Sequence, residues 1–166
     1  MDSSAPLDQD LQNRYTSHHP LEEPRPVPAV ERKFKRHIDS LAKVFEFVDQ
    51  FIIQEKVDDD AKHAFDLAVD ELFTNTVKYH PSNPNDVSIE LRTENQTLFL
   101  VLTDFDVDSF DLTKKTDPDL TGSLKERTPG GLGIYITKKV VDDVQYQYNN
   151  RTSVITLKKS FRRKNV

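Results

Sequence analysis

Two stretches of the chain carry apolar residues at intervals of three and four, and this spacing restricts the fold more than any other feature. The first stretch covers residues 41–52 and the second covers residues 61–77. Such spacing places the apolar side chains on one face of a helix. Asp39 or Ser40 can cap the first helix. The second helix must end before Pro81, which cannot continue it.

Alternation of apolar and polar residues predicts strands around these helices. The expected strands are an edge strand at 30–38, a hairpin at 87–91 and 97–104, and a closing hairpin at 144–148 and 153–159. A third helix is expected immediately before the closing hairpin. Because the strands come in hairpins, the pattern predicts an α+β fold. We expect a two-layer sandwich, in which three helices cover one face of a mostly antiparallel mixed sheet.

Composition and charge limit the class of protein. The length of 166 residues suits one domain with a tail, and we read residues 1–28 as a flexible proline-rich arm and residues 29–166 as the folded domain. The chain has no cysteine, which excludes disulfides and thiolate zinc sites. Its net charge of -5 argues against a nucleic-acid partner.

The sequence also predicts where the protein works. No apolar run reaches the roughly 18 residues that span a bilayer. The acidic, polar start of the chain does not have the pattern of a secretory signal. We therefore expect a cytoplasmic protein with no membrane partner.

Glycine is scarce in this chain, and three of its four glycines fall within four positions, at Gly130, Gly131 and Gly133. They open the third predicted helix, which covers residues 132–141. Glycine costs conformational entropy, so the cluster indicates either a tight turn or a close approach to the backbone. Backbone N–H groups at a helix N-terminus bind phosphate well. The long polar stretch at 114–129 before the glycines is typical of a lid.

Two further patterns carry candidate chemistry. Glu71 and Asn75 lie four residues apart on the second helix, so they share one face. A carboxylate can act as a general base, and an amide oxygen suits magnesium; an ordinary exposed pair is the alternative. The run TDFDVDSFD, at 103–111, ends a strand with carboxylates that can bind a metal, accept a hydrogen bond, or only form an acidic turn.

The order of these patterns resembles the GHKL ATPase superfamily, whose members have the histidine-kinase-like ATP-binding fold. The closer resemblance is to the anti-sigma factor serine kinases. It rests on AVDELFTNTVKY, TDFDVDSFD and PGGLGIYITKKVVDDVQY, and it covers roughly residues 30–160. The resemblance implies ATP and Mg²⁺ as cofactors. It also implies two protein partners, which are a sigma factor and an anti-sigma factor antagonist that is phosphorylated on serine.

The resemblance also implies roles for individual residues. Glu71 would be the general base that activates the serine hydroxyl, and Asn75 would hold the magnesium that bridges the phosphates. Asp104 would accept a hydrogen bond from the amino group of adenine, and Ser153 would lie near the base. Several other residues would lie close to the phosphates: Gly131, Leu132 and Gly133 through their backbone, and Lys78, Lys125 and Arg127 more weakly.

The chain departs from the family pattern in two places. Asp106 replaces the usual glycine, so a charged side chain would stand where adenine approaches the backbone. Tyr79 replaces a histidine, with His80 next to it. The first departure supports an alternative function, a protein-binding module of the same fold with weak or no nucleotide binding.

Two other interpretations concern the edge strand. His37 suggests a sensor histidine kinase fragment, but a phosphoacceptor histidine needs a long dimerising helical hairpin, which the sequence does not offer here. The strand at 30–38 could also pair with a second copy of the chain, so a homodimer is a further expectation.

Overall fold

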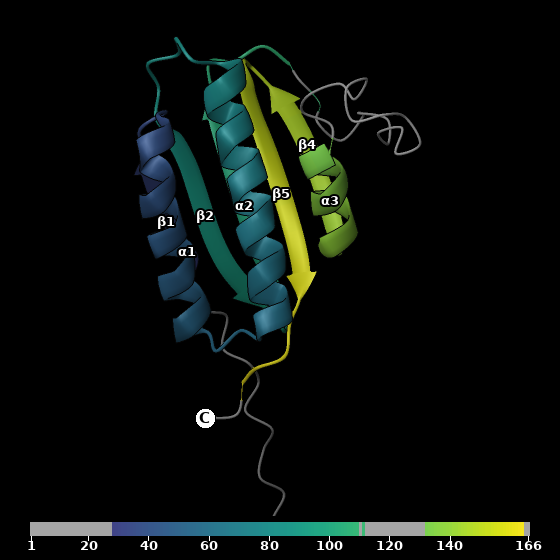
Figure 1. Ribbon diagram of the computed structural model, residues 1–166. Coiled ribbons are helices and arrows are strands. Elements are labelled where there is room, and N and C mark those ends of the chain that lie inside the picture. The colour runs from purple at the N-terminus through teal and green to yellow at the C-terminus, as the bar shows by residue number, and fades with distance from the viewer. Residues whose placement is uncertain (1–27, 110, 112–131, 165–166) are drawn as a thin grey trace, which may run out of the picture.

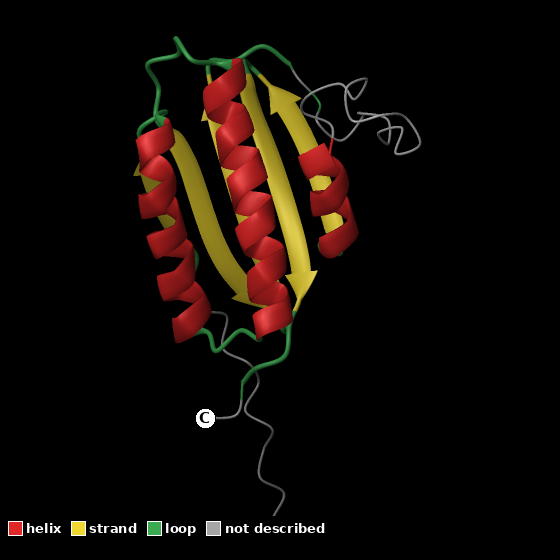
Figure 2. Cartoon of the chain, viewed as in Figure 1, coloured by secondary structure: helices red, strands yellow, loops and turns green. Residues whose placement is uncertain are grey.

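The computed structural model describes residues 28–109, 111 and 132–164 (Figure 1). Within them, three α-helices cover one face of a five-stranded sheet, as Figure 2 shows. The predicted α+β two-layer fold is therefore confirmed. The predicted arm, apart from residue 28, and the predicted lid at 114–129 lie outside the described residues.

The sheet is antiparallel at every pairing of its described strands. The strands are β1 (Val30–Phe34), β2 (Val87–Glu94), β3 (Thr97–Phe105), β4 (Asp143–Asn149) and β5 (Thr152–Ser160). Their order is β1-β2-β3-β5-β4, which makes β3 the central strand and leaves β1 and β4 at the edges. The first strand ends four residues before the predicted position 38, because the chain turns into a short 3-10 helix there.

The helices follow the predicted stripes closely. They are α1 (Leu41–Gln54), α2 (Asp59–Tyr79) and α3 (Leu132–Val140), and the 3-10 helix η2 (Ile38–Ser40) precedes α1. The predicted cap of α1 is wrong in its chemistry. Ser40 holds the cap position but makes no side-chain cap hydrogen bond. Instead, the side chain of His37 accepts a hydrogen bond from the backbone N–H of Asp39 at the start of η2.

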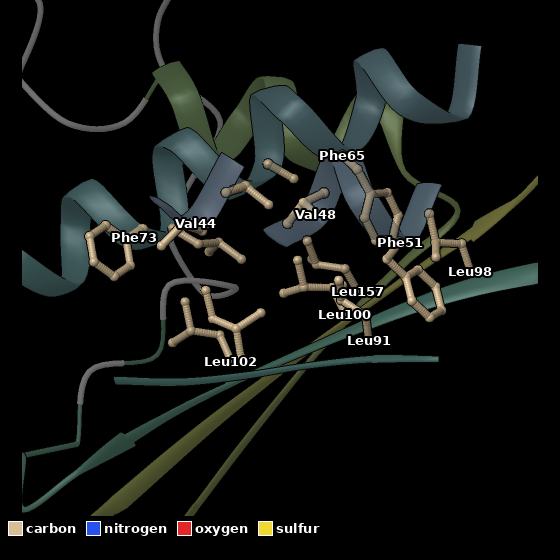
Figure 3. Close-up of a cluster of buried hydrophobic side chains, with 14 of the residues drawn as sticks. Val44, Val48, Phe51, Phe65, Phe73, Leu91, Leu98, Leu100, Leu102 and Leu157 are labelled. Atoms are coloured by element: carbon tan, nitrogen blue, oxygen red, sulfur yellow. The ribbon is translucent and has the colours of Figure 1, made fainter. Parts of the chain in front are cut away.

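The hydrophobic core lies between the helices and the sheet (Figure 3). Phe65 and Phe73 of α2 are fully buried in it, and they face the sheet. On β3, Leu98, Leu100 and Leu102 are buried while the residues between them are half exposed. Because side chains alternate along a strand, the next inward position is Asp104. The apolar row of the central strand thus ends in a carboxylate that points toward the helices.

Asp58 joins the start of α2 to the end of the chain. Its side chain accepts hydrogen bonds from the backbone N–H of Ala61, at 3.0 Å, and from that of Arg162. Burial raises the pKa of Asp58, but these hydrogen bonds outweigh it and hold the pKa below its ordinary value. The carboxylate therefore stabilises the folded state in its ionised form.

We expect Asp58→Ala to lower the free energy of unfolding by about 1 kcal/mol, because the helix loses its cap. Asp58→Asn keeps a cap acceptor, so it should cost less. The lowered pKa makes the wild-type advantage fully present above about pH 4 and lost as the pH falls below it. Urea unfolding of the three proteins at pH 7 and pH 3 measures both effects. Equal midpoints for wild type and Asp58→Ala at pH 7 would contradict the assignment.

Candidate functional site

The candidate site lies where α2 ends and β3 ends, at the upper end of α2 in Figure 1. Asp104 and Ser153 are directly opposed on β3 and β5, and both are buried. They line a small hollow together with Asn75 and His80. The hollow is open on one side, and its volume of about 30 Å³ is room for a water molecule or two rather than a purine ring.

Asp104 is bound by a residue that the sequence patterns did not identify. The guanidinium of Arg36 donates to Oδ1 of Asp104, and a second nitrogen, Nη1, donates to the carbonyl oxygen of Thr76 at 3.3 Å. The Arg36 side chain is 2% exposed and that of Asp104 is 6% exposed. His80 places Nδ1 3.4 Å from the other carboxylate oxygen, Oδ2. The carboxylate is therefore enclosed by positively charged or ionisable groups on both oxygens.

The position of Arg36 follows from the alternation of the first strand. Phe34 is the buried residue at the end of β1. Residue 36 has the same parity, so it continues toward the interior while Lys35 and His37 are exposed. This parity is the signal that could have identified Arg36 from the sequence. The charged run KFKRH instead suggests a wholly solvated segment.

Glu71 and Asn75 form the second part of the site. Asn75 is buried, and its Nδ2 donates to Oε1 of Glu71 at 2.6 Å. This hydrogen bond uses the amide nitrogen of Asn75 and not Oδ1, which is the atom that magnesium would prefer. The two residues share one face of α2, as their spacing predicted.

Gly133 lies against this pair. A β-carbon at position 133 would lie 1.9 Å from Oε2 of Glu71, so no residue with a side chain fits there unless Glu71 moves. The carboxylate thus contacts the first turn of α3, where the positive end of the helix dipole favours an anion. The close approach suggested by the glycine cluster is made, at Gly133, by a carboxylate of the same chain.

Asp106 does not obstruct the hollow, contrary to expectation. Its backbone has φ 54, in the left-handed region that favours glycine, which agrees with the glycine expected at this position. Its side chain is exposed and accepts from Nε of Arg151 at 2.5 Å. Among the described residues of this loop it is Asp108, not Asp106, that lines the hollow.

The remaining predicted residues do not gather at the hollow. Lys78 places its ammonium group 5.5 Å from the centre of the Tyr79 ring, and Lys78 does not line the hollow. Leu132 is the first residue of α3. Gly131, Lys125 and Arg127 lie outside the described residues. The described part of the chain contains no group of three metal-ligating side chains, so a magnesium ion would need oxygens from its ligand as well.

Comparison with known proteins identifies the family. Residues 34–159 match the sequence profile of the histidine kinase-like ATPase domain. The chain belongs to this family. Membership implies nucleotide binding, and the positions of Asn75 and Asp104 fall within the matched segment.

A solved structure supports the same fold. The RsbU and RsbW domains of a Mycobacterium tuberculosis protein superimpose with a TM-score of 0.60 at 10% sequence identity. The match covers 82% of this chain and 33% of that structure, so the chain spans about a third of its relative. No curated protein sequence matches the chain. In addition, none of the described helices has the length and apolar character of a membrane span.

Gly133→Ala tests the contact between α2 and α3. At a helix position with open space around it, this change would stabilise the folded state by up to about 1 kcal/mol. Here the new methyl group overlaps the Glu71 carboxylate, the end of a flexible side chain, so Glu71 must turn away and lose its hydrogen bond to Asn75. That loss, about 1 kcal/mol, should offset the helix gain, and we expect no net stabilisation by chemical denaturation.

The double variant Glu71→Ala/Gly133→Ala is the matched control, because it removes the side chain that the methyl group would meet. Alanine at 133 should then be tolerated or stabilising relative to Glu71→Ala alone. Stabilisation of the wild-type background by the full amount of about 1 kcal/mol expected for an open helix position would contradict the close approach.

Proposed function

We propose that this protein is an ATP-dependent serine protein kinase that acts as an anti-sigma factor and phosphorylates an antagonist protein. The observation that carries the proposal is that Asn75, Asp104 and Ser153 line one hollow at the end of α2, with Glu71 hydrogen-bonded to Asn75 one turn earlier, in a histidine kinase-like ATPase domain. The resemblance of the sequence to anti-sigma factor serine kinases and the RsbW domain of the solved relative support the choice of substrate.

The phosphate end of the site would be formed by α2 and the start of α3. The oxygens of Asn75 and the phosphates fit magnesium, which would neutralise part of the charge on ATP. Glu71 would accept the proton of the serine hydroxyl. The serine oxygen would bond to the γ-phosphorus as the bond from that phosphorus to ADP breaks and ADP leaves. Such catalysis is mostly positioning and electrostatics, which agrees with a site that offers one base and one amide.

The base end of the site would be formed by β3 and β5. Asp104 would accept a hydrogen bond from the adenine amino group, and Ser153 stands directly opposite it. Both residues face the helices rather than solvent. A base that reached them would lie between the sheet and the end of α2.

A second candidate function is a protein-binding module of the same fold that binds nucleotide weakly or not at all. The specific observation in its favour is that Arg36 occupies the carboxylate of Asp104. This alternative predicts that partner binding does not depend on ATP. A strict ATP requirement for partner binding would exclude it.

The protein partners belong to the proposal as well. The sigma factor and the antagonist follow from the sequence resemblance. A homodimer is proposed because β1 is an edge strand whose first four residues are exposed. A cytoplasmic location is part of the same proposal.

Glu71→Gln should reduce phosphate transfer to a serine-containing antagonist by about 10²- to 10⁴-fold, because it removes the proton acceptor. Transfer from γ-labelled ATP measures this directly. The control is Asp70→Asn, which neutralises an exposed carboxylate one residue away on the same helix. An equal loss of phosphate transfer in both variants would show that Glu71 is not the proton acceptor.

Asn75→Ala should weaken the magnesium-dependent part of ATP binding, since the metal loses its amide ligand. Calorimetric titration with ATP, with and without Mg²⁺, measures this part. Wild-type protein should bind more tightly with Mg²⁺, and the variant should show little difference. An unchanged magnesium effect in the variant would refute the role of Asn75.

A further inference from the structure

The ion pair between Arg36 and Asp104 is unusual because it is almost wholly buried. Taking two charges out of water is costly unless their hydrogen bonds are satisfied. The groups around this pair are not all satisfied: Nε of Arg36 and Nδ1 of the neighbouring His80 have no hydrogen-bond partner among the described residues. The arrangement is therefore not optimised for stability alone, and its place in the site calls for a functional reading.

The site of the guanidinium suits a cation. Arg36 lies between the carboxylate of Asp104 and the carbonyl oxygen of Thr76, in the last turn of α2. The C-terminal end of a helix carries partial negative charge, so both neighbours attract the guanidinium. Its planar fork of N–H groups contacts both at once.

Adenine would need the same acceptor. The amino group of adenine is an N–H donor, and Asp104 is the carboxylate that the proposed function assigns to it. In the structure Oδ1 is taken by Arg36, Oδ2 faces His80, and the hollow beside them has a volume of about 30 Å³. A charged guanidinium makes a stronger hydrogen bond to a carboxylate than a neutral amino group does. The two donors therefore compete for Oδ1 of Asp104.

Arg36 is attached where it can leave without disturbing the core. It belongs to the three residues between the end of β1 at Phe34 and the start of η2 at Ile38. Its neighbours Lys35 and His37 are exposed. Rotation of the Arg36 side chain would free Oδ1 of Asp104, whereas Phe34 would stay in the core.

We propose that Arg36 is an internal competitor of adenine. The Arg36–Asp104 ion pair keeps Oδ1 of Asp104 from adenine, and an adenine nucleotide binds as Arg36 leaves Asp104. This inference rests on the proposed function and adds a control to it: any change that withdraws Arg36 raises the affinity for adenine nucleotides and the selectivity for adenine over guanine.

Arg36→Lys is the main test variant. Lysine keeps the positive charge, but a single ammonium cannot span Asp104 and the Thr76 carbonyl as the fork does. Calorimetry with Mg-ADP should give at least about tenfold tighter binding than wild type, which corresponds to the loss of one charge-assisted hydrogen bond. Binding of Mg-GDP should change little. Arg92→Met is the matched control, because this half-exposed arginine lies on β2 against Phe99 and should leave both affinities unchanged.

A second variant covers the case in which removal of one charge impairs folding. Arg36→Met/Asp104→Asn removes both charges together, so no buried charge is left unpaired. It should fold and should not gain adenine selectivity, since the carboxylate is absent. A gain of adenine selectivity in this double variant would overturn the proposal.

The outcomes separate the two proposals. Magnesium tripolyphosphate probes the phosphate end of the site without a base. If it and Mg-ADP bind to no folded variant, the proposed nucleotide function fails. If they bind, but Arg36→Lys binds Mg-ADP no better than wild type or more weakly, Arg36 is not a competitor and this inference alone is overturned.

Discussion

The buried ion pair between Arg36 and Asp104 is the interaction on which the geometry of the site depends. It connects three parts of the chain that are distant in sequence: the turn after β1, the last turn of α2 and the end of β3. The leucines of β3 form an apolar row under the helices, and Asp104 ends that row in a place that is almost wholly buried. A carboxylate there needs a partner. In the structure the partner is a side chain of the same protein.

The other end of the site shows the same principle. Glu71 lies against Gly133 at the start of α3 and accepts a hydrogen bond from Asn75. An anion thus already lies at the helix N-terminus where the phosphates of a nucleotide are expected. Both ends are occupied by internal contacts, a cation at the base end and a carboxylate at the phosphate end. Nucleotide binding in this domain would exchange these contacts for contacts with the ligand, and its affinity would be set by the difference.

The sequence predicted the layers of the fold because the helices and strands have strong periodicity, as on α2 and β3. It predicted some residues of the site and missed others. Glu71, Asn75, Asp104 and Ser153 were found through spacing and resemblance. Three of them line one hollow at the end of α2, and Glu71 is hydrogen-bonded to one of these three, Asn75. Arg36 was missed because a charged side chain beside Lys35 and His37 suggests solvent, although its parity with Phe34 indicates the interior. The direction of the Asp106 side chain depends on a left-handed turn and on Arg151, which are tertiary features that local sequence patterns do not specify.

The central claim is that the carboxylate of Asp104 serves either Arg36 or adenine. The most direct measurement is NMR of the arginine side-chain N–H groups in the wild-type protein, with the Arg36 signal assigned by its absence in Arg36→Lys. In the free protein the Nε–H of Arg36 should exchange slowly with water, because the side chain is buried. Saturation with Mg-ADP should make that exchange fast. A slowly exchanging Arg36 signal that persists in the nucleotide complex would contradict the account.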